Sequence, residues 1–211
     1  MDLFSQEPDL FSLPYAEVKV LAEKCTKCPL AKGRTKVVFG SGSVPCSLML
    51  IGEAPGAEED LQGEPFVGRA GQLLTKILES INIKRPDDIY IANTVKCRPP
   101  ENRAPLASEQ EACRPYLEAQ IRLVRPKIIL LAGAPAVKAV LKKDEPMTSI
   151  RGKWFKLPGT DIDVFPIFHP AYLLRNPSKE KGSPKWITWQ DMLEVKHALE
   201  FHRQVDKLSV Q

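Results

Sequence analysis

Short apolar runs alternate with amphipathic stretches along most of the chain. The apolar runs predict buried strands, because each is bounded by turn-forming residues; they cover residues 47–51, 88–95, 127–131 and 162–168. Apolar residues at helical spacing predict helices in the intervening segments. These helices span residues 15–24, 70–81 and 108–124, and about 135–141, with a final helix from residue 188 onward.

Two helix starts carry a capping pattern. Ser108 and Glu111 form an S-x-x-E box, and Thr188 and Asp191 form a T-x-x-D start. The final helix is expected to turn four apolar residues toward the core: Trp189, Met192, Val195 and Leu199.

Strands alternating with amphipathic helices predict a three-layer α/β/α fold with a central parallel sheet covered on both faces. No internal repeat or linker divides the chain. We therefore expect a single domain over residues 15–205, preceded by a flexible lead-in at 1–14 and followed by a tail at 206–211.

Parallel sheets of this kind bind ligands beyond the carboxyl ends of their strands. Three segments fall at predicted strand ends, namely Gly52–Gly56, Asn93–Cys97 and His169–Pro170. Strand ends always carry loops, so this convergence is suggestive of a site without identifying it.

Composition excludes several classes of protein. Of 211 residues, 43% are hydrophobic and 27% are charged, which is ordinary for a soluble globular chain. No apolar run approaches the ~20 residues that span a bilayer, so no membrane association is expected. The acidic first dozen residues do not resemble a signal or transit peptide, and a cytoplasmic location is expected. The net charge of +4 permits a polyanionic partner without requiring one.

Four of the five cysteines suggest a metal site. Cys25 and Cys28 form a C-x2-C pair, and Cys97 and Cys113 follow downstream. Four thiolates suit structural zinc or an iron–sulfur cluster equally well, so the residues alone do not choose between them. Cys46 lies in an apolar context and is expected to be a small buried side chain.

Three strings, together with the cysteine pattern, closely resemble the family 4 uracil-DNA glycosylases. They are GEAPGAEEDLQGEPFVG at 52–68, NTVKC at 93–97 and HPAYLLRNPS at 169–178, and the resemblance runs from about residue 20 to residue 203. It implies a uracil-DNA glycosylase-like fold and hydrolysis of the N-glycosidic bond of uracil in DNA. It also implies a structural [4Fe-4S] cluster on the four cysteines.

A glycosylase must extrude its base from the duplex, which assigns roles to three residues. Phe66 can stack on the uracil, although it could equally be a core aromatic. Asn93 can pair with uracil O4 and N3–H and reject cytosine, whereas its ordinary role would be a strand-end cap. His169 can hydrogen-bond uracil O2 as negative charge develops there.

The water molecule that hydrolyses the bond also needs a residue that positions or activates it. The best-known superfamily members carry Asp at the position of Ala54, and this chain has no acid there. Glu53 is the first substitute and Glu59 the second, although Glu59 could simply be a solvated acidic helix start. The backbones of Gly52 and Ala54 can contact uracil O2 and the water.

The segment after His169 suits contact with the duplex. Leu173 and Leu174 are expected to form an apolar wedge that holds the base out. Arg175, Lys179 and Lys185 are expected to neutralise phosphates, although each could be an ordinary surface charge.

The sequence allows three further hypotheses. A related branch attaches covalently to DNA through a His in an inserted loop, but the loop RPPENRAPL has no His. A non-catalytic iron–sulfur DNA-binding module tied to replication machinery would not need Asn93 or His169. The segment QEPDLF at 6–11 loosely resembles sliding-clamp binding peptides, and a disordered tail is the simpler interpretation. The enzyme is expected to act as a monomer.

Overall fold

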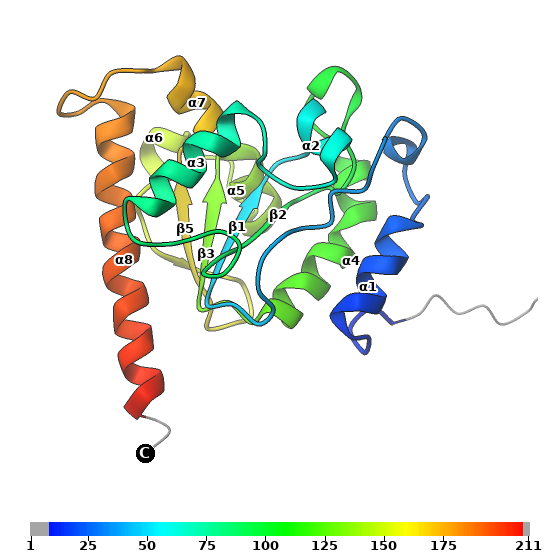
Figure 1. Cartoon of the computed structure of the whole chain (residues 1–211), viewed down its shortest axis with the longest axis horizontal. Coiled ribbons are helices and arrows are strands. Elements are labelled where there is room, and N and C mark those ends of the chain that lie inside the picture. The colour runs from blue at the N-terminus through cyan, green and yellow to red at the C-terminus, as the bar shows by residue number, and fades with distance from the viewer. Residues whose placement is uncertain (1–8, 209–211) are drawn as a thin grey trace, which may run out of the picture.

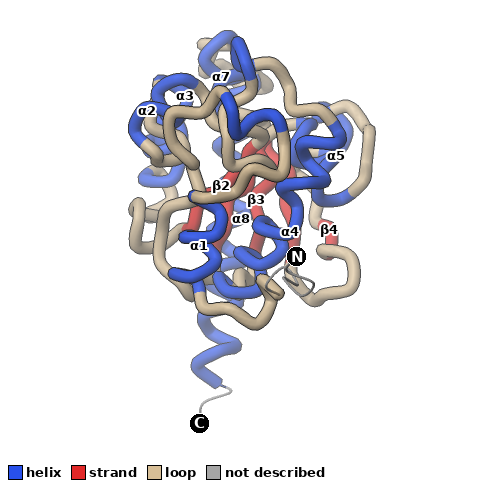
Figure 2. Tube along the Cα trace, turned by 90° about the vertical axis from the view of Figure 1, so that its right-hand side faces the viewer, coloured by secondary structure: helices blue, strands red, loops and turns tan. Residues whose placement is uncertain are grey.

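A computed structural model describes residues 9–208 of the chain and shows a sheet enclosed by helices (Figures 1 and 2). The strand order is β2-β1-β3-β5-β4. The strands are β1 Leu48–Gly52, β2 Tyr90–Asn93, β3 Ile128–Ala132, β4 Phe155–Lys156 and β5 Asp163–Ile167. Neighbouring strands pair in parallel except β4, a short edge strand antiparallel to β5. The predicted three-layer α/β/α fold is confirmed.

The helices cover both faces of this sheet. They are α1 Tyr15–Glu23, α2 Ala57–Gln62, α3 Arg69–Glu79, α4 Ala107–Val124, α5 Ala134–Leu141, α6 Met147–Ile150, α7 Pro170–Arg175 and α8 Pro184–Leu208. Short 3-10 turns occupy Pro29–Lys32 and Pro100–Asn102.

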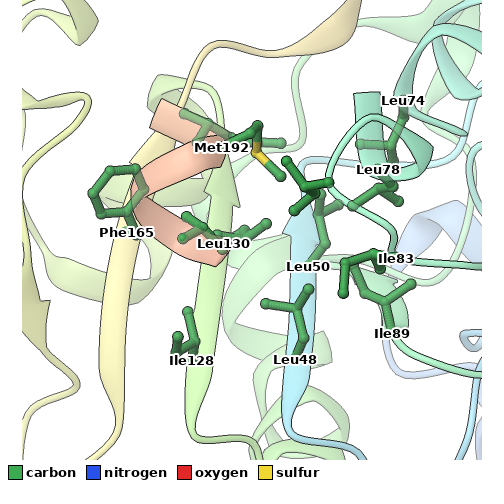
Figure 3. Close-up of a cluster of buried hydrophobic side chains, with 14 of the residues drawn as sticks. Leu48, Leu50, Leu74, Leu78, Ile83, Ile89, Ile128, Leu130, Phe165 and Met192 are labelled. Atoms are coloured by element: carbon green, nitrogen blue, oxygen red, sulfur yellow. The ribbon is translucent and has the colours of Figure 1, made fainter. Parts of the chain in front are cut away.

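Each face of the sheet has its own hydrophobic core, because alternate strand residues point in opposite directions. On one face Leu50 and Leu130 meet Leu74 and Leu78 of α3 and Met192 of α8 (Figure 3). On the other face the intervening strand residues pack against side chains of α4, α5 and α6: Met49, Ile51, Ile129 and Leu131. Helix α1 lies outside α4 and is buried against it through Val18 and Ala22.

Both predicted capping patterns are wrong. Helix α4 begins at Ala107, and the Glu109 carboxylate accepts the Leu106 backbone N–H at 2.8 Å, so Glu109 holds the position assigned to Glu111. Helix α8 begins at Pro184, because proline is well suited to a first helical turn. Thr188 lies inside this helix, where its hydroxyl donates to the Pro184 carbonyl at 2.8 Å.

The buried face of α8 also differs by one residue from the expectation. Met192, Val195 and Leu199 are buried as predicted, but Trp189 is 47% exposed. Thr188 takes the inward position instead, since it lies four residues before Met192 on the same helical face.

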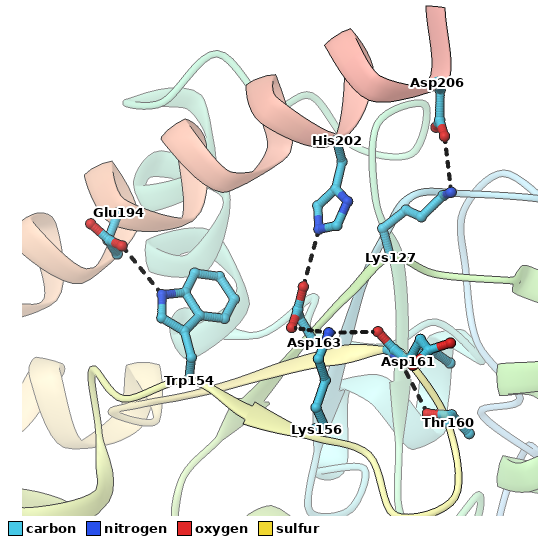
Figure 4. Close-up of polar contacts among 10 residues, drawn as sticks. Lys127, Trp154, Lys156, Thr160, Asp161, Asp163, Glu194, His202 and Asp206 are labelled. Atoms are coloured by element: carbon cyan, nitrogen blue, oxygen red, sulfur yellow. Dashed lines mark hydrogen bonds and ion pairs between the residues drawn. The ribbon is translucent and has the colours of Figure 1, made fainter. Parts of the chain in front are cut away.

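Polar contacts join α8 to the edge of the sheet (Figure 4). His202 Nε2 lies 3.1 Å from an Asp163 carboxylate oxygen, and Trp154 Nε1 donates to Glu194 at 3.2 Å. Lys127 pairs with Asp206 at 3.0 Å, beyond the expected domain end at residue 205. Exposed ion pairs of this kind contribute little stability, so the buried apolar face dominates the docking of α8.

The ends of the chain fall partly outside the description. Residues 6–8 of the clamp-like segment lie outside the described residues, as do 209–211. Within the expected lead-in, Leu10 is buried in the cluster that contains Val18 of α1. Among the described residues, no helix is long and apolar enough to cross a membrane.

Candidate active site

A cavity of about 860 Å³ opens beyond the carboxyl ends of the parallel strands. Parallel strands all end at the same edge of the sheet, so the segments after β1, β2, β3 and β5 converge there. Phe66, Asn93 and His169 all line this one cavity, and so do Glu53, Ala54 and Glu59. Figure 1 shows α2, α3 and α7 at this end of the sheet.

Phe66 is held in a conformation that few non-glycine residues adopt. Its φ is +54°, in the left-handed region, and its side chain is only 6% exposed. The Arg85 guanidinium donates to the Pro65 carbonyl at 2.8 Å and to the Phe66 carbonyl at 2.9 Å. A Cβ at Gly71 would overlap the Phe66 carbonyl. Arg85 and Gly71 therefore fix the backbone from which the Phe66 ring enters the cavity.

Asn93 ends β2 directly opposite Gly52, the last residue of β1. Its side chain is 2% exposed and makes no hydrogen bond to any other described residue. Buried amides are normally hydrogen-bonded, so an amide that is free within the protein and faces a cavity is suited to a ligand. A Cβ at Gly52 would lie 2.7 Å from Phe66 Cζ and would overlap Asn93 Oδ1. Glycine is therefore required here for Asn93 and Phe66 to meet.

His169 follows β5 and forms the N-cap of α7. Its Nδ1 accepts the backbone N–H of Ala171 at 3.1 Å, so the neutral ring carries its proton on Nε2. Burial, and to a smaller extent Arg175, lower the pKa of His169 to about 4, while Glu59 opposes the shift. The imidazole is therefore neutral at physiological pH and offers a single N–H donor.

The two candidate carboxylates differ in their hydrogen bonds. Glu59 accepts backbone N–H groups from Gly56 at 3.1 Å and from Val67 and Gly68 at 3.0 Å. Glu53 has no side-chain hydrogen-bond partner among the described residues, and burial raises the pKa of its carboxyl. Glu59 thus closes the loop between β1 and α3, while Glu53 presents a carboxylate without a protein partner to the cavity.

The segment expected to contact the duplex is partly buried. Leu173 is 1% exposed, because α7 packs this side chain inward, and α7 lies against α3. Leu174 is 36% exposed and can reach a ligand. Arg175 is exposed and also lines the cavity, Lys179 is exposed, and Lys185 is half-buried at the start of α8.

Besides residues 133–135 after β3, two parts of the cavity wall have no counterpart in the sequence prediction. Asn102 and Arg103 come from the proline-rich loop, where Arg103 forms a two-point ion pair with the buried Glu109 at 2.7 and 2.9 Å. Met147 and Thr148 come from α6. The run of prolines before α4 was the only signal for the first wall, and α6 is too short to give one.

A second, small cavity is lined by four cysteines, namely Cys25, Cys28, Cys97 and Cys113. All are free thiols, and Cys46 lies apart from them in the core beneath α4 and α5. Among the described residues, no three His, Cys, Asp or Glu side chains are arranged to hold a single metal ion. The four thiols therefore share a space without closing around one ion.

Three cationic residues also line the four-cysteine cavity, namely Lys27, Arg34 and Lys96. Arg34 donates to Cys97 Sγ at 3.3 Å and to the Cys25 carbonyl at 2.7 Å. Lys96 is 2% exposed, and its Nζ donates to the Asn93 carbonyl at 2.6 Å. Burial lowers the pKa of Lys96 to about 8, although Cys113 and Cys97 oppose the shift.

The chain is similar in sequence to a known family of proteins. The model of the uracil DNA glycosylase superfamily matches residues 39–193. The chain is 48% identical over 159 residues to a type-4 uracil-DNA glycosylase of Thermotoga maritima, covering 75% of this chain and 82% of that protein. It is 43% identical over 182 residues to one of Saccharolobus solfataricus, covering 83% and 82%.

A more distant relative is the type-5 uracil-DNA glycosylase of Pyrobaculum aerophilum. Identity falls to 30% over 152 residues, covering 65% of this chain and 67% of that protein. Similarity is thus higher to the type-4 proteins, in agreement with the resemblance seen in the three sequence strings. The chain belongs to the uracil-DNA glycosylase superfamily, among its type-4 members.

Proposed function

We propose that this protein removes uracil from DNA by hydrolysing its N-glycosidic bond, leaving an abasic site. The proposal follows from family membership and from one observation above all: Phe66, Asn93 and His169 line a single cavity at the strand ends. The glycosidic bond is hidden in the duplex, so the base must be extruded to reach such a cavity.

Base selection is proposed for Asn93. Its amide nitrogen can donate to uracil O4 and its amide oxygen can accept from N3–H, whereas cytosine presents the opposite polarity at both positions. A wrong base would leave this 2%-exposed amide unpaired, which is costly in a buried site. Phe66 supplies the flat surface against which the base stacks.

The leaving uracil is proposed to depart as an anion that His169 stabilises. A neutral imidazole with Nε2–H directed at O2 can donate a hydrogen bond where negative charge grows. The Ala171 N–H holds the other ring nitrogen at 3.1 Å, so the donor is oriented before the base arrives.

The water is proposed to be positioned by Glu53. A carboxylate without a protein partner can accept a proton from water and stabilise positive charge on the sugar. Glu59 is proposed to act indirectly, because its three backbone N–H partners fix the loop that carries Glu53 and Phe66. Backbone groups of Gly52 and Ala54 border the same space.

DNA contact is proposed for the exposed side chains around α7. Leu174 is the member of the leucine pair that can enter the duplex, since Leu173 is buried. Arg175, Lys179 and Lys185 can neutralise phosphates, which makes binding salt-sensitive. We propose that the protein acts on DNA as a monomer in the cytoplasm.

A [4Fe-4S] cluster is proposed for the four-cysteine cavity. Cys25, Cys28, Cys97 and Cys113 supply the four thiolates that such a cluster requires. Four thiolates would also suit zinc, and the similarity to the type-4 uracil-DNA glycosylases favours the cluster. The cluster would act as a structural brace joining the segments that carry the cysteines.

A direct test treats a uracil-containing oligonucleotide with the protein and then with alkali. The expected result is strand breakage at uracil and none at cytosine or thymine in the same position. Asn93→Ala should lose breakage by about 10²-fold or more while salt-dependent DNA binding stays near wild type. Intact DNA after wild-type treatment would favour a non-catalytic binding module. A protein–DNA adduct that survives denaturing electrophoresis would point to the covalent branch.

A further inference from the structure

One buried lysine connects the base-reading strand end to the four-cysteine cavity. Lys96 Nζ donates to the Asn93 carbonyl at 2.6 Å, and the same residue lines the cavity that holds the four thiols. Cys113, which lies on α4, lines the same cavity. Lys96 thus joins the strand end at Asn93 to the four-cysteine cavity.

A fully buried ammonium needs compensation, because removing it from water costs several kcal/mol. The Asn93 carbonyl is neutral, and no carboxylate forms an ion pair with Lys96 among the described residues. Cys97 and Cys113 line the same cavity as Lys96, so thiolates at these positions would place negative charge beside its ammonium. Four thiolates around a cluster leave a net negative charge in this cavity, which would supply the missing compensation.

We propose that Lys96 is a positioning residue that makes the geometry of Asn93 depend on the cluster. Its ammonium offsets cluster charge on one side and fixes the Asn93 carbonyl on the other. This inference rests on the proposed cluster and on the proposed uracil excision. It gives the cluster a role in base recognition although the hydrolysis itself requires no electron transfer.

Few contacts hold the Asn93 side chain in place, so loss of the Lys96 contact should affect its orientation. The side-chain amide makes no hydrogen bond within the described chain, so its position depends on the backbone of residue 93 and on the close packing of Gly52. Loss of the Lys96 contact would leave the Asn93 carbonyl without its charged donor. The amide would then be free to leave the orientation that pairs with uracil.

The test uses Lys96→Met, which removes the ammonium and keeps a flexible side chain of similar size. Lys96→Gln is a second variant that also lacks the charge but keeps a polar end. Lys207→Met is the matched control, because it removes one lysine from the exposed distal end of α8. Iron content per chain, the rate at which absorption near ~400 nm bleaches in EDTA, and kcat and KM for a uracil oligonucleotide are measured for each.

Lys96→Met should bleach roughly 10- to 100-fold faster than wild type, and the fraction that retains iron should lose kcat by a similar factor. KM should change by less than about threefold, because the basic surface around α7 is intact. Lys207→Met should behave as wild type in every measurement. If Lys96→Met does not fold, Lys96→Gln carries the same expectation for bleaching.

Wild-type bleaching in either Lys96 variant would overturn the inference. So would a variant that bleaches quickly yet excises uracil normally while iron remains bound, since the link to Asn93 would then be absent. A wild-type protein that is colourless, or that leaves uracil in place, would instead refute the proposed function before any variant is compared.

Discussion

The Phe66 ring lies against the His169 imidazole, with 5.7 Å between ring centroids and a tilt of 34° between planes. Phe66 comes from the loop between α2 and α3 and His169 from the segment after β5, so the fold brings them together at one end of the sheet. A base stacked on Phe66 would present one edge to Asn93 and another to His169.

The Arg85 contacts predict that the backbone of Phe66 needs support. Arg85→Met should lower single-turnover excision by about 10- to 100-fold, because a displaced stacking ring misplaces the base. It should also lower stability by about 1–3 kcal/mol, since two carbonyls lose a charged donor. Arg85→Lys, which keeps the charge but not the two-point geometry, should fall in between. Excision at the wild-type rate in Arg85→Met would show that the loop carrying Phe66 keeps its conformation without Arg85.

The close approach at Gly52 predicts a selective loss of activity. Gly52→Ala would place a Cβ 2.7 Å from Phe66 Cζ and against Asn93 Oδ1, so excision should fall by about 10²-fold. Gly33→Ala is the matched control, because nothing lies within 4 Å of the added Cβ. Thermal denaturation shows whether each variant folds. Equal activity in the two variants would argue against the tight packing of Gly52.

The titration of Glu53 predicts the acid limb of the pH–rate profile. Burial raises the pKa of Glu53, so its carboxylate is lost at a higher pH than that of an ordinary glutamate as the solution is acidified. His169 stays neutral until the pH approaches about 4 and therefore does not produce this limb. Glu53→Gln should lower kcat by about 10²–10⁴-fold and abolish the limb. An unchanged acid limb in Glu53→Gln would assign it to another group.

The proposed cluster predicts colour in the purified protein. Cys97→Ala should reduce the broad absorption near ~400 nm and destabilise the fold, because one of four ligands is lost. Cys46→Ala should keep the colour, since Cys46 packs in the core apart from the four-cysteine cavity. Full colour and stability in Cys97→Ala would remove Cys97 from the proposed ligand set.

Hydrophobic periodicity is enough to predict the sheet and the long helices. The runs around Leu50, Leu130 and Phe165 are short, apolar and bounded by turns, and all three form central strands. The helix starts are harder to predict, because neighbouring residues of similar type fit the same start pattern. Glu109 and Pro184 mark the starts that the structure shows. The two-residue β4 and the one-turn α6 are too short to give a periodic signal.

Some residues of the candidate site can likewise be predicted from the sequence, and others cannot. Phe66, Asn93 and His169 could be grouped from sequence, because parallel strand ends must meet at one edge and the family strings mark them. Arg85 could not, since only the folded loops bring it to the Phe66 carbonyl, and Lys96 could not, since a lysine in a loop is ordinarily exposed rather than buried against a carbonyl. Leu173 and Leu174 are adjacent and chemically alike, so only the packing of α7 separates the buried one from the exposed one.

The most direct test is a crystal structure of Glu53→Gln bound to uracil-containing duplex DNA. We predict that the uracil lies outside the helix and stacks on Phe66, with O4 and N3–H paired to the Asn93 amide and O2 facing His169 Nε2. A uracil that remains stacked in the duplex, or that occupies a cavity away from these three side chains, would contradict the account.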